Sequence, residues 1–217
     1  MWLHSDHYTE LMRRRVARLE AEMVCAAQLR EELAPVVSPG MSLLDAGCGP
    51  GHYYWSLRSL GIEYHGIDPT PHYIALGRQF LAKGGLPPER LQVVGIEELT
   101  GTYDVVVCYN VLQYLPDYRE ALGVLCSTAE RILVIRTLLD TRTCIRYEQD
   151  PTLGDALRDA RFFFNIYAIG EVSEFIRSRG FTVRRVADRR SGDAPEMVLG
   201  MPHPYRILFC ERDRRPR

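Results

Sequence analysis

The sequence has no long hydrophobic run, and this absence excludes a class of proteins at once. No stretch of its 217 residues reaches the roughly 18 consecutive apolar residues that a membrane-spanning helix needs. The N-terminal stretch carries charged side chains where a signal peptide would have its apolar core. We therefore expect a protein that is neither inserted in a membrane nor exported, and that is cytoplasmic.

Paired cysteines and a large charge of one sign are missing too. No two cysteines form a CxxC pair, so the sequence predicts neither a zinc site nor a disulfide framework. The formal net charge of -1 provides no field that would gather nucleic acid. With 46% hydrophobic and 25% charged residues, the composition is that of an ordinary globular protein. We expect no nucleic-acid partner.

Strand-like and helix-like patterns alternate along the chain, without repeats or low-complexity linkers. Such alternation is typical of a parallel sheet that is covered by helices on both faces. We therefore expect a Rossmann-like, doubly wound α/β fold. Seven segments have the apolar pattern of a strand: 41–46, 63–68, 91–95, 103–110, 131–136, 181–188 and 205–211. Helical patterns cover 8–31, 52–60, 72–83, 118–126 and 170–180, and the first of these has an apolar stripe from Tyr8 to Met23.

A glycine-rich loop follows the first expected strand, in the stretch LLDAGCGPG (43–51). Gly47, Gly49 and Gly51 are spaced GxGxG, which differs from the GxGxxG of dinucleotide-binding proteins. Asp45 would repel a pyrophosphate beside the loop and would suit a ligand with an ammonium group. Asp68 ends the second expected strand, where a carboxylate can accept hydrogen bonds from a ribose. An ammonium and a nucleoside together describe S-adenosylmethionine.

Four segments in order resemble the motifs of the class I S-adenosylmethionine-dependent methyltransferases. They are LLDAGCGPG, YHGIDPT, VVGIEELT and YDVVVCYNVLQYLPD, and the resemblance extends from about residue 40 to residue 211. In that family the last strand runs antiparallel to the others, so the resemblance implies a seven-stranded, mostly parallel sheet with 205–211 antiparallel.

The resemblance also implies which residues bind the cofactor. Asp45, Gly47, Cys48 and Gly49 would line its methionine part, and Asp68 would bind the ribose. Pro69, Ile96 and Glu97 would lie around the adenine, with Cys108 and Tyr109 beneath the sulfonium. Asp68 could instead cap the helix that begins in DPTPHYIALG, and Glu97 could be an ordinary surface residue.

The acceptor side is less fully specified. We expect Gln113, Tyr114, Asn165 and Tyr167 to contact the substrate, since the polar ends of Asn165 and Tyr167 need partners within an apolar stretch. Ubiquinone-type O-methyltransferases carry acidic residues and a histidine after the fourth strand, where this chain has Asn110, Gln113 and Tyr114. Without those groups a hard divalent metal is not expected. The catalytic base is not identified, and Tyr114, Asp140 or another residue of 137–168 could serve.

These expectations lead to one functional hypothesis and two alternatives. We expect a single methyltransferase domain over 1–217, with a helical extension at about 1–35 and a substrate-side insertion at about 137–168. It would transfer a methyl group to a hydroxyl or amine of a small molecule, sugar-like or from a natural-product pathway. The alternatives are a catalytically degenerate protein that binds S-adenosylmethionine, and a nucleotide-dependent oxidoreductase that shares the strand–glycine–helix layout.

Overall fold

The computed structural model describes residues 6–149, 161–192, 194–198 and 201–213. Contacts divide the chain into two compact units. Unit 1 comprises Met1–Glu98 with Gln149–Arg161, and unit 2 comprises Leu99–Glu148 with Phe162–Arg217. None of the helices in the described part of the chain combines the length and the apolar composition that crossing a bilayer requires.

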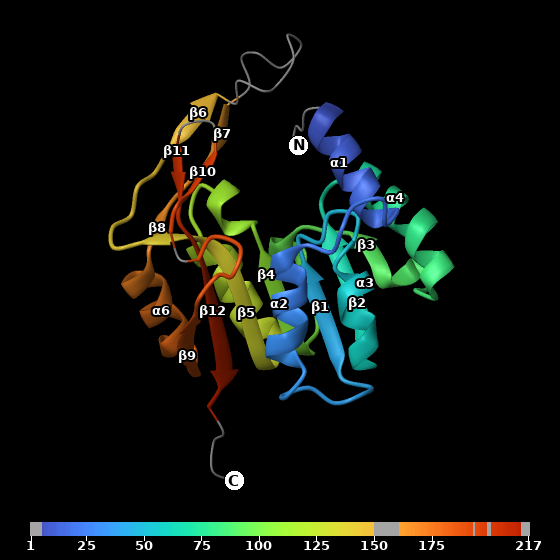
Figure 1. Cartoon of the computed structure of the whole chain (residues 1–217). Helices are drawn as coiled ribbons and strands as arrows, with labels where there is room; N and C mark the ends of the chain where they lie inside the picture. Colours follow the sequence, from blue (N-terminus) through green and yellow to red (C-terminus); the bar gives the residue numbers. More distant parts are fainter. Residues whose placement is uncertain (1–5, 150–160, 193, 199–200, 214–217) are drawn as a thin grey trace. The chain divides into compact units, whose positions relative to one another are not determined.

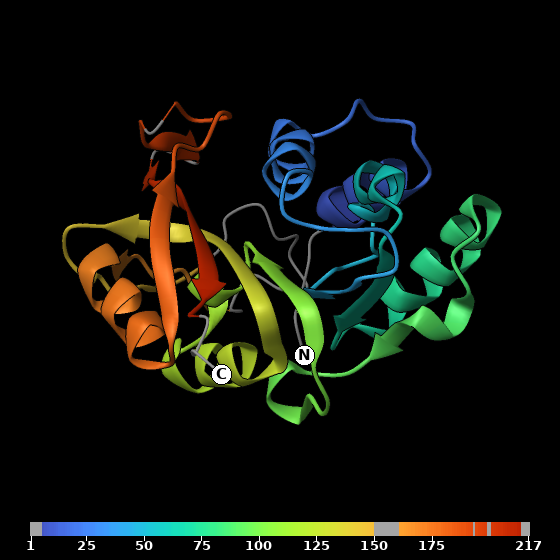
Figure 2. The same ribbon diagram turned by 90° about the horizontal axis from the view of Figure 1, so that it is seen from below.

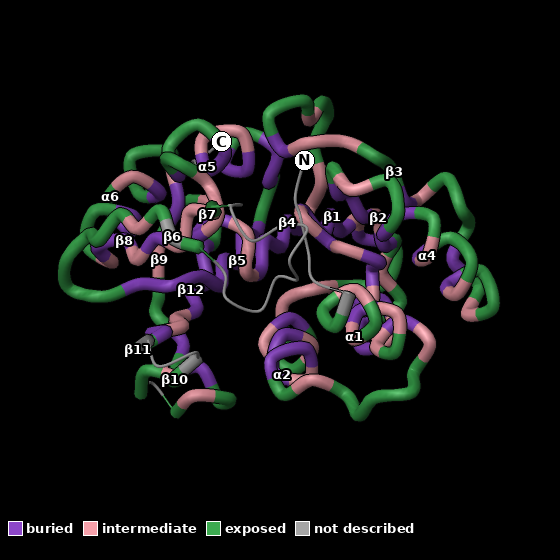
Figure 3. The backbone as a smooth tube through the Cα atoms, turned by 90° about the horizontal axis from the view of Figure 1, so that it is seen from above, coloured by how far each residue is buried: buried purple, intermediate pink, exposed green. Residues whose placement is uncertain are grey.

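Unit 1 contains three parallel strands in the order β3-β2-β1 (Figure 1). Most residues of β1 and the last three of β2 are buried, as expected for strands inside a covered sheet, and Figure 3 shows the buried backbone in purple. Helix α4 packs against β2 and β3. The elements of the unit are α1 (Asp6–Val16), α2 (Val24–Leu33), β1 (Ser42–Ala46), α3 (Tyr54–Leu57), β2 (Glu63–Asp68), α4 (Pro71–Leu81) and β3 (Leu91–Val93), with 3-10 turns at Arg58–Leu60, Ala82–Gly84, Pro88–Arg90 and Ile96–Glu98.

The expectation of one helix over 8–31 was wrong, because the segment forms two helices, α1 and α2, with a break between them. Arg18 lies in the break with a φ of 60°, a left-handed conformation that a continuous helix does not allow. Leu19, placed on the expected apolar stripe, is 56% exposed. Met12 and Val16 are buried, so the stripe describes α1 but does not continue through the break.

Unit 2 has a mixed sheet in the order β4-β5-β12-β9. Strands β4 and β5 are parallel, whereas β12 runs antiparallel to both β5 and β9, which confirms the expected antiparallel last strand. Helix α6, orange in Figure 2, packs against β9. The main elements are β4 (Tyr103–Tyr109), the 3-10 turn Leu112–Tyr114, α5 (Arg119–Thr128), β5 (Ala129–Asp140), α6 (Ile169–Ser178), β9 (Phe181–Val186) and β12 (Tyr205–Arg212).

All seven expected strands form, and the expected α/β class is confirmed. The segment 137–168, expected as an insertion, is partly regular, because β5 continues to Asp140 and β8 (Tyr167–Ala168) pairs with its end. Two small two-stranded sheets were not predicted. They consist of β6 (Tyr147–Gln149) with β7 (Arg161–Phe163), and of β10 (Glu196–Val198) with β11 (Met201–His203). The part of the expected insertion at 150–160 lies outside the described residues.

Candidate functional site

The glycine loop of unit 1 leaves the carboxyl end of β1 and bends over the end of β2. Gly47, Gly49 and Gly51 all have positive φ, at 79°, 55° and 74°. Side chains other than glycine rarely adopt this conformation, which explains the alternate glycines. The N–H groups of Gly47 and Cys48 both donate to the Ile67 carbonyl, at 2.8 and 2.9 Å. The loop is therefore held at the edge of the sheet where ligands bind in this fold class.

The glycines of unit 1 serve different purposes. A Cβ atom on Gly51 would lie 3.0 Å from the Leu81 side chain, and one on Gly77 would lie 2.6 Å from the Pro50 carbonyl oxygen. Both glycines are needed for packing between the loop and its neighbours. A Cβ atom on Gly49 would meet no described atom within 4 Å. The space in front of Gly49 is thus open among the described residues.

Asp68, the last residue of β2, connects the loop with the start of α4. Its Oδ2 accepts a hydrogen bond from the Gly49 N–H at 2.9 Å, and its Oδ1 accepts one from the Thr70 N–H at 2.8 Å. The second contact closes a turn just before α4, whose N-cap residue is Thr70, so Asp68 supports the approach to the helix and is not itself the cap. The first is a contact with the glycine loop. Since a carboxylate offers about four lone-pair sites, capacity for a ligand hydroxyl is left.

Asp45 lies inside unit 1 beneath the glycine loop and is 2% exposed. The Tyr64 hydroxyl donates to its Oδ2 at 2.6 Å. Burial raises the pKa of Asp45 to about 7, an effect that the Tyr64 hydrogen bond opposes and the Asp68 charge reinforces. A cationic group of a ligand nearby would favour the ionised carboxylate.

The other predicted cofactor residues of unit 1 differ in burial. Cys48 is buried, its thiol donates to the Gly49 carbonyl at 3.2 Å, and a Cβ on Gly66 would lie 2.8 Å from its sulfur. Its side chain therefore packs toward β2. Ile96 is buried in the 3-10 turn that also contains the exposed Glu97, and Pro69 is exposed. Their contacts with adenine remain predictions.

In unit 2, the predicted residues gather at the carboxyl ends of β4 and β5. Cys108 and Tyr109 end β4 and are buried. Gln113 is completely buried in the following turn, where its Oε1 accepts a hydrogen bond from the Thr137 hydroxyl at 2.8 Å. Its Nε2 has no hydrogen-bond partner among the described residues. The Tyr114 ring meets Phe164 edge-on at 5.2 Å.

Asn165 and Tyr167 do find polar partners, which are backbone groups and each other, because the Asn165 Nδ2 also donates to the Tyr167 hydroxyl at 3.1 Å. The Asn165 Nδ2 donates to the Leu115 carbonyl at 2.8 Å, and its Oδ1 accepts from the Arg146 N–H at 2.9 Å. The Tyr167 hydroxyl donates to the same Leu115 carbonyl at 2.9 Å. These bonds connect the segment around β8 to the turn after β4. Contact of either side chain with an acceptor remains a prediction.

Sequence reasoning missed a buried ion pair in unit 2. Arg136 of β5 is 1% exposed, and its guanidinium binds the fully buried Asp188 with Nε at 2.8 Å and Nη2 at 2.6 Å from Oδ2. Arg136 also donates to the Oδ1 of Asn110, which directly follows β4. The sequence feature that could have predicted this ion pair is the arginine at the end of the apolar run RILVIR, because an unpaired buried charge there would be costly.

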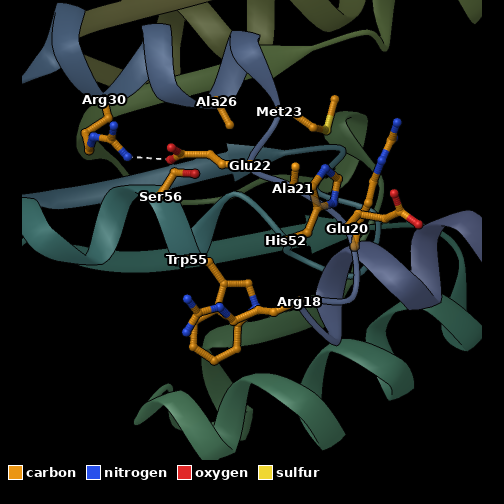
Figure 4. A pocket seen from close by; sticks show the side chains of 11 residues that line it. Arg18, Glu20, Ala21, Glu22, Met23, Ala26, Arg30, His52, Trp55 and Ser56 are labelled. Atoms are coloured by element: carbon orange, nitrogen blue, oxygen red, sulfur yellow. Dashed lines mark hydrogen bonds and ion pairs between the residues drawn. The ribbon is translucent and has the colours of Figure 1, made fainter.

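A hollow in unit 1 lies apart from all these residues. It has a volume of about 350 Å³ and none of the ten predicted cofactor residues lines it. Figure 4 shows Arg30 paired with Glu22 on one side, and the Arg18 guanidinium lies 5.2 Å from the Trp55 ring. Burial and the charge of Arg15 lower the pKa of His52, another lining residue, to about 3. Much of its charged lining is therefore already paired within the protein.

Metal donors do not gather in the part of the chain that the structure describes. No group of three or more His, Cys, Asp or Glu side chains there is placed to hold a metal ion. In the turn after β4, the amide oxygens of Asn110 and Gln113 already accept hydrogen bonds from Arg136 and Thr137.

Known methyltransferase sequences match part of this chain. A family model described as a methyltransferase domain matches residues 44–128. A ubiquinone biosynthesis O-methyltransferase of Methylocella silvestris is 36% identical over 91 residues, which cover 41% of this chain and 35% of that protein. The chain spans between 34% and 45% of the length of the first curated relatives it matches.

Solved structures match over nearly the whole chain. Magnesium protoporphyrin IX methyltransferase from Synechocystis PCC 6803, solved with bound S-adenosylmethionine, has a TM-score of 0.64 and 19% identity, covering 94% of this chain and 92% of that one. A 1,6-didemethyltoxoflavin-N1-methyltransferase from Burkholderia thailandensis has a TM-score of 0.58 and 18% identity, covering 98% and 92%. At these identities the likeness shows the fold. Residues 44–128 thus match a methyltransferase domain, and the chain shares the fold of methyltransferases solved with bound S-adenosylmethionine.

Proposed function

We propose that this protein catalyses the transfer of a methyl group from S-adenosylmethionine to a hydroxyl or amine of a small molecule. One observation carries the proposal. The glycine loop presents open space at Gly49, directly beside the Asp68 carboxylate that holds its N–H. A loop of this kind at the carboxyl end of β1, with a carboxylate at the end of β2, suits a nucleoside ligand without phosphate.

Within unit 1, each residue has a proposed role toward the cofactor. Gly47, Cys48 and Gly49 would form the floor under its methionine part, with the Asp45 carboxylate favouring the ammonium. Asp68 would accept hydrogen bonds from the ribose hydroxyls with its remaining lone pairs. Pro69, Ile96 and Glu97 would lie at the adenine. In unit 2, Cys108 and Tyr109 would lie at the sulfonium.

The acceptor is proposed as a small molecule with a nucleophilic oxygen or nitrogen. The names of two similar proteins specify transfer to oxygen in one case and to a nitrogen, N1, in the other. Methyl transfer from a sulfonium is an in-line displacement, and alignment of donor and acceptor in a site without water can supply much of the acceleration. The residues Gln113, Tyr114, Asn165 and Tyr167 are proposed to shape the acceptor side.

Two measurements on the full chain test the proposal. Calorimetry should detect binding of S-adenosylhomocysteine and no comparable binding of NADH. Incubation of a metabolite extract with isotopically labelled S-adenosylmethionine should then yield a labelled small molecule. Gly49→Val protein, in which a branched side chain would fill the open space, is the matched control and should yield none. Tight NADH binding without S-adenosylhomocysteine binding would instead indicate an oxidoreductase.

A second candidate function is supported by one observation. Asn110, Gln113 and Tyr114 place no carboxylate or imidazole in the turn after β4. A protein that binds S-adenosylmethionine without transferring its methyl group would also have such a turn. Binding of S-adenosylhomocysteine together with the absence of every labelled product would favour this second function.

A further inference from the structure

Unit 2 contains a group of three polar side chains beside the carboxyl end of β4, of which two are buried and one, Asn110, is partly exposed. Arg136 and Asp188 form an ion pair in which both side chains are almost completely buried. The Arg136 guanidinium carbon also lies 4.0 Å from the centre of the Tyr205 ring. The guanidinium is thus held on two sides, by a carboxylate and by an aromatic face.

The third member is Asn110, the residue that directly follows β4. Its φ of 61° is left-handed, a conformation that asparagine adopts more readily than most residues. Its backbone N–H donates to the Arg136 carbonyl at 2.7 Å, and its side-chain Oδ1 accepts a hydrogen bond from Arg136 Nη1. Both the backbone and the side chain of Asn110 are therefore bound to the same arginine.

This arrangement determines which way the amide of Asn110 faces. A guanidinium only donates hydrogen bonds, so the atom that faces it must be the amide oxygen. The amide nitrogen, with two N–H donors, is then directed elsewhere. Asn110 is partly exposed, and its Nδ2 donates to no atom of the described residues. Asn110 consequently offers a fixed hydrogen-bond donor where ligands bind in this fold class.

We propose that Asn110 determines the specificity of the site for an acceptor that reacts through oxygen, because its Nδ2 donates a hydrogen bond to the reacting oxygen. This inference rests on the proposed function and narrows it. A hydroxyl oxygen has two lone pairs, so one can attack the methyl carbon while the other accepts from Asn110. A neutral amine has one lone pair, which the attack itself requires. An ammonium group has no lone pair, and its N–H groups would face the N–H groups of the Asn110 amide.

The reaction that this geometry supports is balanced without a further reactant. The hydroxyl oxygen forms a bond to the methyl carbon as the carbon–sulfur bond breaks, and that electron pair remains on the sulfur. The hydroxyl oxygen gives up its proton, which reaches the bulk solvent as the products leave. The products are an O-methyl ether, S-adenosylhomocysteine and one proton. Arg136 acts here as a positioning residue, because it contacts Asn110 and not the acceptor.

The first test uses the labelled extract described above and sorts the products by the methylated atom with mass spectrometry. An O-methylated product supports the inference. An N-methylated product would overturn it and leave the proposed methyltransferase function intact. Absence of any labelled product, with S-adenosylhomocysteine binding intact, would instead count against the proposed function itself and remove the inference with it.

The second test compares variants with the acceptor that the extract identifies. Asn110→Asp replaces the donor by an oxygen in nearly the same shape, and Asn110→Gly removes the side chain while tolerating the left-handed backbone. Both should lower kcat/KM at least about tenfold, as expected for loss of one hydrogen bond to the reacting group. The Kd of S-adenosylhomocysteine should change less than about twofold, since only the acceptor contact is lost. Unchanged kcat/KM in folded Asn110→Asp protein would overturn the assignment.

Arg136→Met tests the positioning role with a readout that mere stability would not change. Without the guanidinium, the Asn110 amide is free to turn its oxygen toward the acceptor. The preference for the hydroxyl acceptor over its amino analogue should therefore fall about tenfold. A preference equal to that of the wild type, in folded Arg136→Met protein, would contradict the role of Arg136. If this variant does not fold, the Asn110 variants alone decide the inference.

Discussion

The carboxylate of Asp68 accepts a hydrogen bond from the backbone N–H of Gly49, at 2.9 Å, across the carboxyl ends of two neighbouring parallel strands. The same carboxylate accepts a bond from the Thr70 N–H and so begins α4. One side chain thereby positions the glycine loop and the following helix, and it retains lone pairs for a ligand. Its structural role and its proposed role toward the ribose are compatible because they use different lone pairs.

We expect Asp68→Ala to weaken S-adenosylhomocysteine binding by about 1.5–3 kcal/mol, the range for hydrogen bonds to a charged group. Asp68→Asn should lose less, because its amide oxygen can still accept one of the bonds. Calorimetry measures the affinities, and a thermal unfolding curve for each variant controls for folding. Wild-type affinity in a folded Asp68→Ala protein would show that Asp68 supports only the turn before α4 and the glycine loop, and does not bind the ligand.

Gly49 and Gly77 should respond differently to substitution. Gly49→Val places its side chain in open space, so we expect loss of S-adenosylhomocysteine binding with only the modest cost of an unfavourable φ, roughly 1–2 kcal/mol. Gly77→Ala places its Cβ against the Pro50 carbonyl, so we expect a lower melting temperature despite the better helix propensity of alanine. Normal cofactor binding by folded Gly49→Val protein would place the ligand elsewhere.

The stability of the protein should depend on pH through Asp45. Its pKa is raised from 3.8 to about 7, so the folded protein holds a proton that the unfolded chain releases. The resulting stabilisation is fully present below about pH 4, and it is lost as the pH rises through 7. Its size is at most about 4 kcal/mol, from roughly three pKa units.

The matched variant for this prediction is Asp45→Asn, which keeps an acceptor for the Tyr64 hydroxyl and cannot ionise. His52 has a lowered pKa, so it contributes in the opposite sense, with stability lost as the pH falls from 6.5 toward 3. The comparison therefore uses the difference in the free energy of unfolding between wild type and variant, by denaturant titration from pH 4 to 8. A difference that does not change with pH would show that Asp45 is ionised throughout.

Turnover should not require a divalent metal. Mg²⁺ prefers carboxylate and other hard oxygen ligands, and the amide oxygens of Asn110 and Gln113 are engaged within the protein. Asp117, the next acidic residue along this segment of the sequence, accepts a hydrogen bond from the Arg119 N–H at the start of α5. Once an acceptor is known, rates with excess EDTA and with added Mg²⁺, Mn²⁺ or Zn²⁺ should agree. Loss of turnover on chelation, restored by one ion, would identify a metal-dependent mechanism.

Local sequence pattern was sufficient for most of the elements and for the glycine loop. The runs YDVVVCY and RILVIR are apolar on both faces, which suits strands covered on both sides, and they form β4 and β5. Gly47, Gly49 and Gly51 could be interpreted from spacing alone because positive φ is a property of single residues. The break at Arg18 was not predictable in this way, because the apolar spacing continues through it to Leu19 and Met23.

The roles of the polar residues were decided by the tertiary structure. Asn110, Arg136 and Asp188 are separated by 26 and 52 residues in the chain, and only the pairing of β4, β5, β12 and β9 brings them together. Asn165 and Tyr167 were identified as polar groups in need of partners, but their partner, the Leu115 carbonyl, is distant in sequence. The sequence determines which groups must be satisfied when buried. Long-range packing decides which partner satisfies each one, and therefore which donor is left for a ligand.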